Sequence, residues 1–440
     1  MHRIGGVTDA RVAAADICAD LRSGDLLDPA FDRRIARLDA RDRRWVRELV
    51  YGMLRRRSRL DAFLDARVNG GAYRLDPDLH DLLRLGAAQL LYMESVPAYA
   101  AIAQTVELAK RRHGIGASKL ANAVLRRLDR ERDTLLLPPT SNPVDALAVE
   151  GSHPRWLVER WVGRWGTSET QRLLEANNQE APLIARPWHV VREQLEAMFE
   201  SAGVHGADAP LVRDSIVLSS PVSSLTELGP FRQGLFHLQD PASTLVTQYA
   251  SVPTGANVAD LCAAPGGKSV ELSRSAGQVF ASDLSLARLQ RVVENVQRLE
   301  IASLHVYAAD ARFPAIRPVD VVLVDTPCTG TGTFRRHPDA RWRLKVSDLA
   351  VMSSIQRSIL HTAATVVRPG GWLVYSTCSL EPEENDEQIA WFLQRHPDFR
   401  VDAPPEGVVP TAVLDNGLLR VLPQRHGTDG AFAARLRRAA

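Results

Sequence analysis

The chain has 440 residues, a length that typically divides into two or three domains and leaves ample chain for a sizeable core. Its 45% hydrophobic and 24% charged residues are ordinary for a globular protein, and a formal net charge of +2 excludes a uniform polycation. No apolar run approaches the roughly 20 residues that cross a bilayer, and no secretory signal opens the chain, so we expect a cytoplasmic protein. Four cysteines without a C-x-x-C pair predict neither a disulfide scaffold nor a metal site.

Residues 1–137 are predicted to form a compact all-α domain. Apolar residues recur at three- and four-residue spacing, strand-like alternation is absent, and glycine-containing breaks separate the segments. The predicted helices include 11–21, 42–57, 78–93, 98–112 and 119–132. Cys18 lies among alanines and an isoleucine on the first of them, where a buried small hydrophobe is expected.

Basic residues gather in two clusters of this domain. Each alone is typical of a solvated helix face, but two on one small domain favour a nucleic-acid surface. They comprise Arg55, Arg56, Arg57 and Arg59, and then Lys110, Arg111, Arg112, Lys119, Arg126, Arg127 and Arg130. The segments 83–92, 96–97, 106–110 and 122–126 resemble the NusB family, an all-helical RNA-binding fold, and the resemblance covers residues 5–132.

A proline-rich linker at 138–143 ends the helical region, since proline breaks both helix and sheet. Residues 145–235 mix short helices and strands and predict a small α+β unit. Trp156 and Trp161 are five residues apart and share a helix face only loosely, so core packing is favoured over base stacking.

From residue 236 the pattern alternates strand and helix, which predicts an α/β domain with a mostly parallel sheet. The predicted strands are 257–261, 278–282, 304–308, 319–324 and 371–376, and the helices include 286–299 and 346–367. Ligands of such sheets bind beyond the carboxyl ends of the strands. The residues that carry chemistry are expected at that edge.

The segment 258–268 predicts a cofactor loop between a strand and a helix. Gly266 and Gly267 allow close approach of the backbone, and the helix start offers free N–H groups. Cys262 stands where a phosphate-binding P-loop needs glycine, and the G-x-G-x-x-G pattern is absent. Asp283, roughly 20 residues further on, could accept ribose hydroxyls or cap the next helix; Asp310, after the third strand, suits an adenine amino group.

Two further strands each run into a cysteine. Asp325, Pro327 and Cys328 follow an apolar strand, and a basic stretch at 335–342 comes next, where a phosphate backbone could dock. Cys378 follows the last predicted strand and precedes the acidic segment 381–385. Two thiols delivered to one sheet edge are difficult to explain as packing.

These three segments resemble the S-adenosylmethionine-dependent RNA cytosine-5 methyltransferases, which usually have Ala and Ser where this chain has Thr326 and Thr329. The resemblance implies S-adenosyl-L-methionine as cofactor. The residues it implies for binding are Cys262, Ala263, Ala264, Pro265, Gly266, Gly267, Lys268, Asp283, Asp310 and Asp325. Cys262 would contribute its backbone and not a third reactive thiol, and Lys268 could place a cation near the cofactor or the base.

The chemistry explains why two thiols are needed. C5 of cytosine is a poor nucleophile, and addition of a thiolate at C6 makes it enamine-like; the thiolate must later leave. The resemblance implies Cys378 as nucleophile, Cys328 as promoter of adduct release, and Asp325 as a donor to or acceptor from the N3/N4 edge. DNA cytosine-5 methyltransferases instead attack with the Pro-Cys thiol, which would be Cys328.

The order of the three domains (1–137, 145–235 and 236–440, the last a Rossmann-like class I methyltransferase) resembles the bacterial 16S rRNA cytosine-5 methyltransferases of the RsmB/NOP family. The resemblance implies a monomer that methylates 16S rRNA at cytosine 967 in the usual rRNA numbering. Another rRNA site or tRNA is the alternative substrate, and an RNA-binding assembly factor with a vestigial methyltransferase fold is the alternative class.

Overall fold

The computed structural model describes residues 3–4, 6–219 and 225–440, and the chain folds into two compact units. The helical unit contains Met1–Gln179 together with Phe334–Arg343, and the α/β unit contains Glu180–Thr333 and Leu344–Ala440. Residues 1, 2 and 5 of the predicted helical domain and 220–224 of the predicted α+β unit lie outside the described residues.

The helical unit confirms the all-α prediction. Its helices are α1 (Asp9–Arg22), α2 (Leu27–Ile35), α3 (Ala40–Arg55), α4 (Arg57–Asp65), α5 (Pro77–Tyr92), α6 (Ala98–Glu131), α7 (Pro143–Glu150), α8 (Arg155–Asn178) and α14 (Ala340–Arg343). A two-residue antiparallel pair, β1 (Arg3–Ile4) with β2 (Val7–Thr8), precedes α1 and was not expected. The predicted helix 42–57 is broken at Arg56, and α6 joins two predicted helices across a kink at Gly114 (φ 83°).

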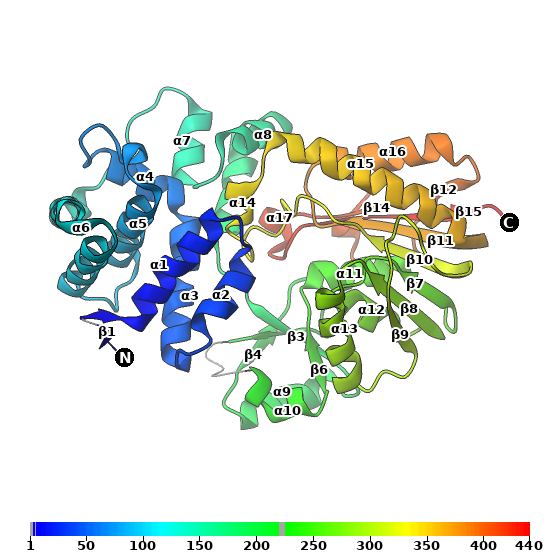
Figure 1. The fold of residues 1–440 in the computed structure, drawn as a ribbon. Coiled ribbons are helices and arrows are strands. Elements are labelled where there is room, and N and C mark those ends of the chain that lie inside the picture. The colour runs from blue at the N-terminus through cyan, green and yellow to red at the C-terminus, as the bar shows by residue number, and fades with distance from the viewer. Residues whose placement is uncertain (1–2, 5, 220–224) are drawn as a thin grey trace. The chain divides into compact units, whose positions relative to one another are not determined.

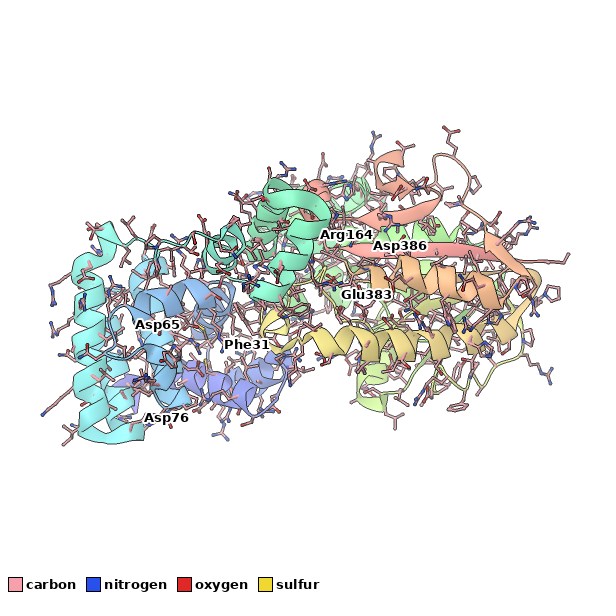
Figure 2. The ribbon with its side chains drawn as sticks, turned by 90° about the horizontal axis from the view of Figure 1, so that it is seen from above. Phe31, Asp65, Asp76, Arg164, Glu383 and Asp386 are labelled. Carbon is pink, nitrogen blue, oxygen red and sulfur yellow. The ribbon has the colours of Figure 1, made fainter. Side chains whose placement is uncertain are left out.

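Local capping and apolar spacing explain these helices. Asp39 accepts the amide of Asp42 (2.7 Å) at the start of α3, and Asp76, labelled in Figure 2, accepts the amide of Asp78 (2.8 Å) at the start of α5. The apolar faces of α1 to α6 form one core, in which Cys18 is 3% exposed, as predicted.

The segment Phe334–Arg343 packs within the helical unit and corrects one expectation. Arg341 is completely buried and donates to the carbonyls of Ser152 and Asn177 and to the side-chain oxygen of Asn178, at 2.7–3.3 Å. Trp342 donates to the carbonyl of Leu54 (2.8 Å). Arg341 is therefore a structural residue and cannot dock a phosphate backbone.

The small α+β part of the α/β unit is a four-stranded antiparallel sheet of order β4-β5-β3-β6, with two helices beside it. Its elements are β3 (Leu183–Pro187), α9 (Arg192–Ser201), β4 (Gly206–Asp208), β5 (Ile216–Leu218), α10 (Gly229–Arg232) and β6 (Phe236–Leu238). Arg186 and His237 lie 3.2 and 2.9 Å from the buried carboxylate of Glu271, which connects this sheet to helix α12 (Gly267–Leu272).

The large sheet has nine strands in the order β13-β14-β15-β11-β10-β7-β8-β9, with β12 paired to β15. They are β7 (Asn257–Asp260), β8 (Gln278–Asp283), β9 (Leu304–Ala308), β10 (Val319–Asp325), β11 (Val367–Thr377), β12 (Phe399–Val401), β13 (Leu414–Asp415), β14 (Leu418–Val421) and β15 (Ala431–Arg438). The five strands β11, β10, β7, β8 and β9 are parallel, as predicted, and the C-terminal strands add antiparallel pairs that make the sheet mixed.

Alternation along each strand sends side chains to two buried faces. Val321 and Leu323 pack on the face covered by α11 (Pro241–Ala250), α12 (Gly267–Leu272) and α13 (Leu286–Arg298). Val322 and Val324 pack on the face covered by α15 (Val346–Ala363) and α16 (Asp386–Arg395) (Figure 1). The short α17 (Pro423–His426) follows β14, and α15 stops short of the predicted residue 367. Among the described residues, no helix has the length and apolar character to cross a membrane.

Candidate active site

The two cysteine loops meet because their strands are neighbours. β10 and β11 pair in parallel with Asp325 opposite Ser376, so the loops that follow leave the sheet side by side. The amide of Gly332 donates to the carbonyl of Cys378 (2.9 Å), and the sulfur atoms of Cys328 and Cys378 are 3.3 Å apart. Two predicted site residues that are 50 positions apart in the chain thus touch.

The environment of Cys328 favours its protonated form. The hydrogen bond with Cys378 and burial both raise the pKa of the Cys328 thiol well above its ordinary value. The contact with Cys378 contributes further, because two thiolates at this distance would repel one another. Cys328 therefore keeps its proton at neutral pH and can act as a proton donor or hydrogen-bond donor.

Lys268 and Asp325 form an ion pair beside the thiols. The Lys268 ammonium lies 2.7 Å from Asp325 Oδ2, and the Ser376 hydroxyl donates to Asp325 Oδ1 at 2.7 Å. Burial alone would lower the pKa of Lys268, but the charge of Asp325 and a smaller contribution from Cys378 raise it. With two donors on its carboxylate, Asp325 is an acceptor in this structure.

The predicted cofactor loop lies between β7 and α12. The Ala263 amide donates to the carbonyl of Ser282 (2.8 Å), which anchors the loop on β8. Gly266 has φ 104°, a left-handed conformation that favours glycine, and an added Cβ would lie 3.0 Å from Val292. The Cys262 side chain packs against the core on the sheet face that α15 and α16 cover, and burial raises its pKa well above the ordinary value.

Asp283 and Asp310 stand at the carboxyl ends of adjacent strands. Asp283 accepts the amide of Ala264 (3.2 Å) and that of Ser285 (3.0 Å), so it supports the cofactor loop as well as the start of the next helix. Each carboxylate oxygen keeps a further lone pair for a ligand hydroxyl. Asp310 is paired with Arg312 through both of its oxygens in this structure.

A fourth carboxylate, Asp260, was not singled out from the sequence. It ends β7, is 1% exposed, and accepts the Ser269 hydroxyl at 2.6 Å, while its Oδ1 has no hydrogen-bond partner within the described part of the chain. Burial raises the pKa of Asp260 to about 7. Its position, as the acidic residue directly after the apolar pair Val258 and Ala259, was the signal that could have found it.

The basic clusters of the helical unit differ in exposure. In the first cluster Arg55 is buried and donates to the carbonyl of Arg335, and its three neighbours lie over aromatic rings. The second cluster follows α6, where all members except Arg112 are exposed. The α6 cluster is therefore the better candidate for a phosphate-binding surface.

Four carboxylates thus gather at the carboxyl edge of β7, β8, β9 and β10. This acceptor-rich edge suits a cofactor that brings ribose hydroxyls, amino groups and a sulfonium cation, and the loop and its neighbours could hold it. A doubly wound sheet with such an edge defines the class I S-adenosylmethionine-dependent methyltransferases.

Comparison with protein families places the chain within this class. The family model for the 16S rRNA methyltransferase RsmB/F matches residues 251–437, the NusB family model matches 8–130, and the ferredoxin-like domain of RsmF/B-like methyltransferases matches 153–224. The chain is 34% identical to the probable ribosomal RNA small subunit methyltransferase B of Synechocystis, over 98% of this chain and 99% of that one. It is 34% identical to the ribosomal RNA small subunit methyltransferase B of Vibrio cholerae, with 90% and 92% covered. The chain belongs to the RsmB/F family of rRNA methyltransferases, which use S-adenosyl-L-methionine.

Solved structures agree with this assignment. The crystal structure of PH0851 superposes with a TM-score of 0.80 at 26% identity and covers 97% of this chain and 98% of that one. A methyltransferase homologue from Pyrococcus horikoshii gives a TM-score of 0.58 at 26% identity, over 68% of this chain and 100% of that one. The predicted fold class, a helical NusB-like domain with a small α+β unit and a Rossmann-like methyltransferase, is confirmed.

Proposed function

We propose that the protein transfers a methyl group to C5 of a cytosine in 16S rRNA, at cytosine 967, through a covalent bond between a cysteine and C6 of the base. The observation that carries the proposal is the pair of thiols 3.3 Å apart at the sheet edge, beside the Lys268–Asp325 ion pair. Methyl transfer to an oxygen or an exocyclic nitrogen needs no thiol. The C5 reaction, in contrast, uses one thiol to attack the base and a second to promote release of the adduct.

Cys378 is the nucleophile in this proposal. Its thiolate adds to C6, and the electron pair of the C5–C6 double bond moves to C5. S-adenosyl-L-methionine supplies the methyl group as an electrophile when bound. The raised pKa of Cys328 makes it the weaker candidate for attack, and the Lys268 ammonium, whose own pKa is raised in part by Cys378, lies close to the second thiol.

Cys328 and Asp325 complete the reaction. After methylation, a base takes the C5 proton, the electrons of the C5–H bond restore the C5–C6 double bond, and the electrons of the C6–S bond leave with the Cys378 sulfur as a thiolate. Cys328, in contact with Cys378, is placed to help the leaving sulfur as it regains negative charge. Asp325 would face the N3/N4 edge of the base and hold it by accepting a hydrogen bond from the N4 amino group.

The RNA must present the target base unpaired or flipped out. We assign RNA binding to the NusB-like region 1–137, with the exposed α6 cluster as its phosphate-contacting surface, and to the α+β region 145–235; residues 236–440 carry the chemistry. A monomer in the cytoplasm belongs to the same proposal. The alternative substrate is another rRNA site or a tRNA, which the same chemistry would serve.

The two cysteine variants test the mechanism. Cys378→Ala should abolish transfer while S-adenosylmethionine binding, measured by calorimetry, persists; retained transfer would mean that Cys328 is the nucleophile. Cys328→Ala should accumulate a protein–RNA adduct that survives denaturing electrophoresis, because attack still occurs and release fails. Normal turnover of Cys328→Ala without adduct would contradict its release role.

A further inference from the structure

The acidic segment after the second thiol loop takes no part in the mechanism above. Figure 2 shows Glu383 and Asp386 at the N-terminal end of α16, on either side of Glu384 and Asn385. Glu384 is completely buried. A buried carboxylate is costly unless its oxygens are fully paired, so its partners indicate its purpose.

Every partner of the Glu384 carboxylate lies next to a thiol or supports a thiol loop. Oε1 accepts the backbone amide of Thr329 at 2.9 Å, and Oε2 accepts the Thr329 hydroxyl. Oε2 also accepts the hydroxyl of Ser379. Thr329 directly follows Cys328, and Ser379 directly follows Cys378. The Glu384 carboxylate therefore accepts hydrogen bonds from the residue after each cysteine.

Gln356 extends this arrangement from α15. Its side-chain amide donates to Glu384 Oε1 and to the carbonyl of Pro327, both at 3.0 Å. Pro327 and Thr329 flank Cys328 in the chain, so the thiol is held from both sides. The Tyr375 hydroxyl donates to the backbone carbonyl of Glu384 (2.6 Å) and so holds the backbone of Glu384 in place.

All the donors to Glu384 are neutral. Burial raises the pKa of Glu384, and the bonds from Ser379, Thr329 and Gln356 oppose that rise. The Ser379 hydroxyl accepts the amide of Glu381 (3.1 Å), which leaves its own proton for the carboxylate. An amide and hydroxyl groups that all donate require an acceptor, which is the ionised carboxylate.

We propose that Glu384 is a positioning residue: its ionised carboxylate joins the loops after β10 and β11 and sets the sulfur atoms of Cys328 and Cys378 at their contact distance. The reaction that the two thiols perform rests on the function proposed above, whereas the role of Glu384 in holding the two sulfur atoms together does not. Its negative charge also adds to the causes that keep Cys328 protonated, after the hydrogen bond to Cys378 and burial. Glu384 thus supports the separate roles of Cys378 as nucleophile and Cys328 as the protonated thiol, without touching the substrate.

The test measures thiol proximity and needs no RNA. Diamide, which oxidises two thiols to a disulfide and takes up both hydrogens, is added to the full-length protein, and the Cys328–Cys378 disulfide is quantified by peptide mass spectrometry. Glu384→Gln keeps the shape but turns one acceptor into a donor that opposes the existing donors. We expect cross-linking about tenfold slower, because approach of the sulfur atoms becomes less frequent.

Glu387→Gln is the matched control, an exposed glutamate on the first turn of α16 that loses the same charge. It should cross-link at the wild-type rate. In both variants the S-adenosylmethionine Kd should stay within about twofold, because neither residue touches the cofactor loop. Cross-linking of Glu384→Gln at the wild-type rate would overturn the proposal.

A second variant decides the matter if Glu384→Gln fails to fold. Thr329→Val removes one hydroxyl donor and keeps the shape and the backbone amide, and cross-linking should be at least about threefold slower. An unchanged rate in Thr329→Val would overturn the proposal in that case. If the wild-type protein cross-links rapidly but transfers no methyl group, the proposed function fails while the positioning role of Glu384 stands.

Discussion

Replacing Asp260 with Asn removes an ionisable group from the core of the α/β unit. Asp260 is 1% exposed, its Oδ2 accepts the Ser269 hydroxyl, and its Oδ1 has no hydrogen-bond partner among the described residues. Burial raises the pKa of this carboxyl from 3.8 to about 7, although the bond from Ser269 opposes the shift. The folded protein therefore resists ionisation of Asp260, and the unfolded chain does not.

The sign and size of the effect follow from this difference. Because the folded pKa lies above the unfolded one, the stabilisation is complete below pH 3.8 and is lost as the pH rises through about 7. Between pH 5 and pH 8 the wild-type protein should lose about 3 kcal/mol of unfolding free energy at this site. The amide that replaces the carboxyl cannot ionise, so this loss is absent from the variant.

The assay is urea unfolding of both proteins at pH 5 and pH 8. The stability of Asp260→Asn relative to the wild type should increase by about 3 kcal/mol from the lower to the higher pH. Asp208→Asn is the control, because that carboxylate is 89% exposed and its replacement should change stability by less than about 1 kcal/mol at either pH. An equal stability difference between Asp260→Asn and the wild type at both pH values would show that Asp260 does not titrate between pH 5 and pH 8 in the folded protein.

Lys268→Met removes the partner of Asp325 and should slow methyl transfer by about 100-fold with a much smaller change in cofactor Kd; equal losses would mean that Lys268 only binds the cofactor. The double variant Lys110→Ala, Lys119→Ala removes two exposed cations of the α6 surface and should weaken RNA binding and lower its salt slope by about two, with cofactor binding unchanged; an unchanged slope would exclude this surface. Arg341→Met leaves buried carbonyls without donors and should destabilise the helical unit by about 3 kcal/mol; a wild-type unfolding midpoint would contradict its structural role.

The sequence predicted the parts of the fold that local patterns specify. Apolar runs such as 319–324 and the glycine-containing turn at 266–267 identified the parallel strands and the loop beyond them, because alternation and turn chemistry act over a few residues. The helical domain followed from its three- and four-residue spacing. The antiparallel strands β14 and β15 were not predicted, since their pairing depends on contacts distant in the chain.

The sequence placed the candidate site residues at one edge of the predicted sheet, but it did not predict the hydrogen bonds between them. The Asp325 and Lys268 side chains are 57 residues apart in sequence, and the partners of Glu384 come from three different elements, so no periodicity reports them. The stretch 335–342 was interpreted from its charge alone as a phosphate site. Burial of Arg341 among carbonyl oxygens is a tertiary property, and it excludes a phosphate contact for that residue.

The proposed reaction modifies one atom of one base, so mapping the methylated product identifies it. The purified protein is incubated with unmodified 16S rRNA and methyl-labelled S-adenosyl-L-methionine, and the modified positions are read by bisulfite sequencing together with nucleoside mass spectrometry. We expect 5-methylcytidine at position 967 for the wild type and none for Cys378→Ala. Methylation at an exocyclic nitrogen or a ribose oxygen, or full activity of Cys378→Ala, would contradict it.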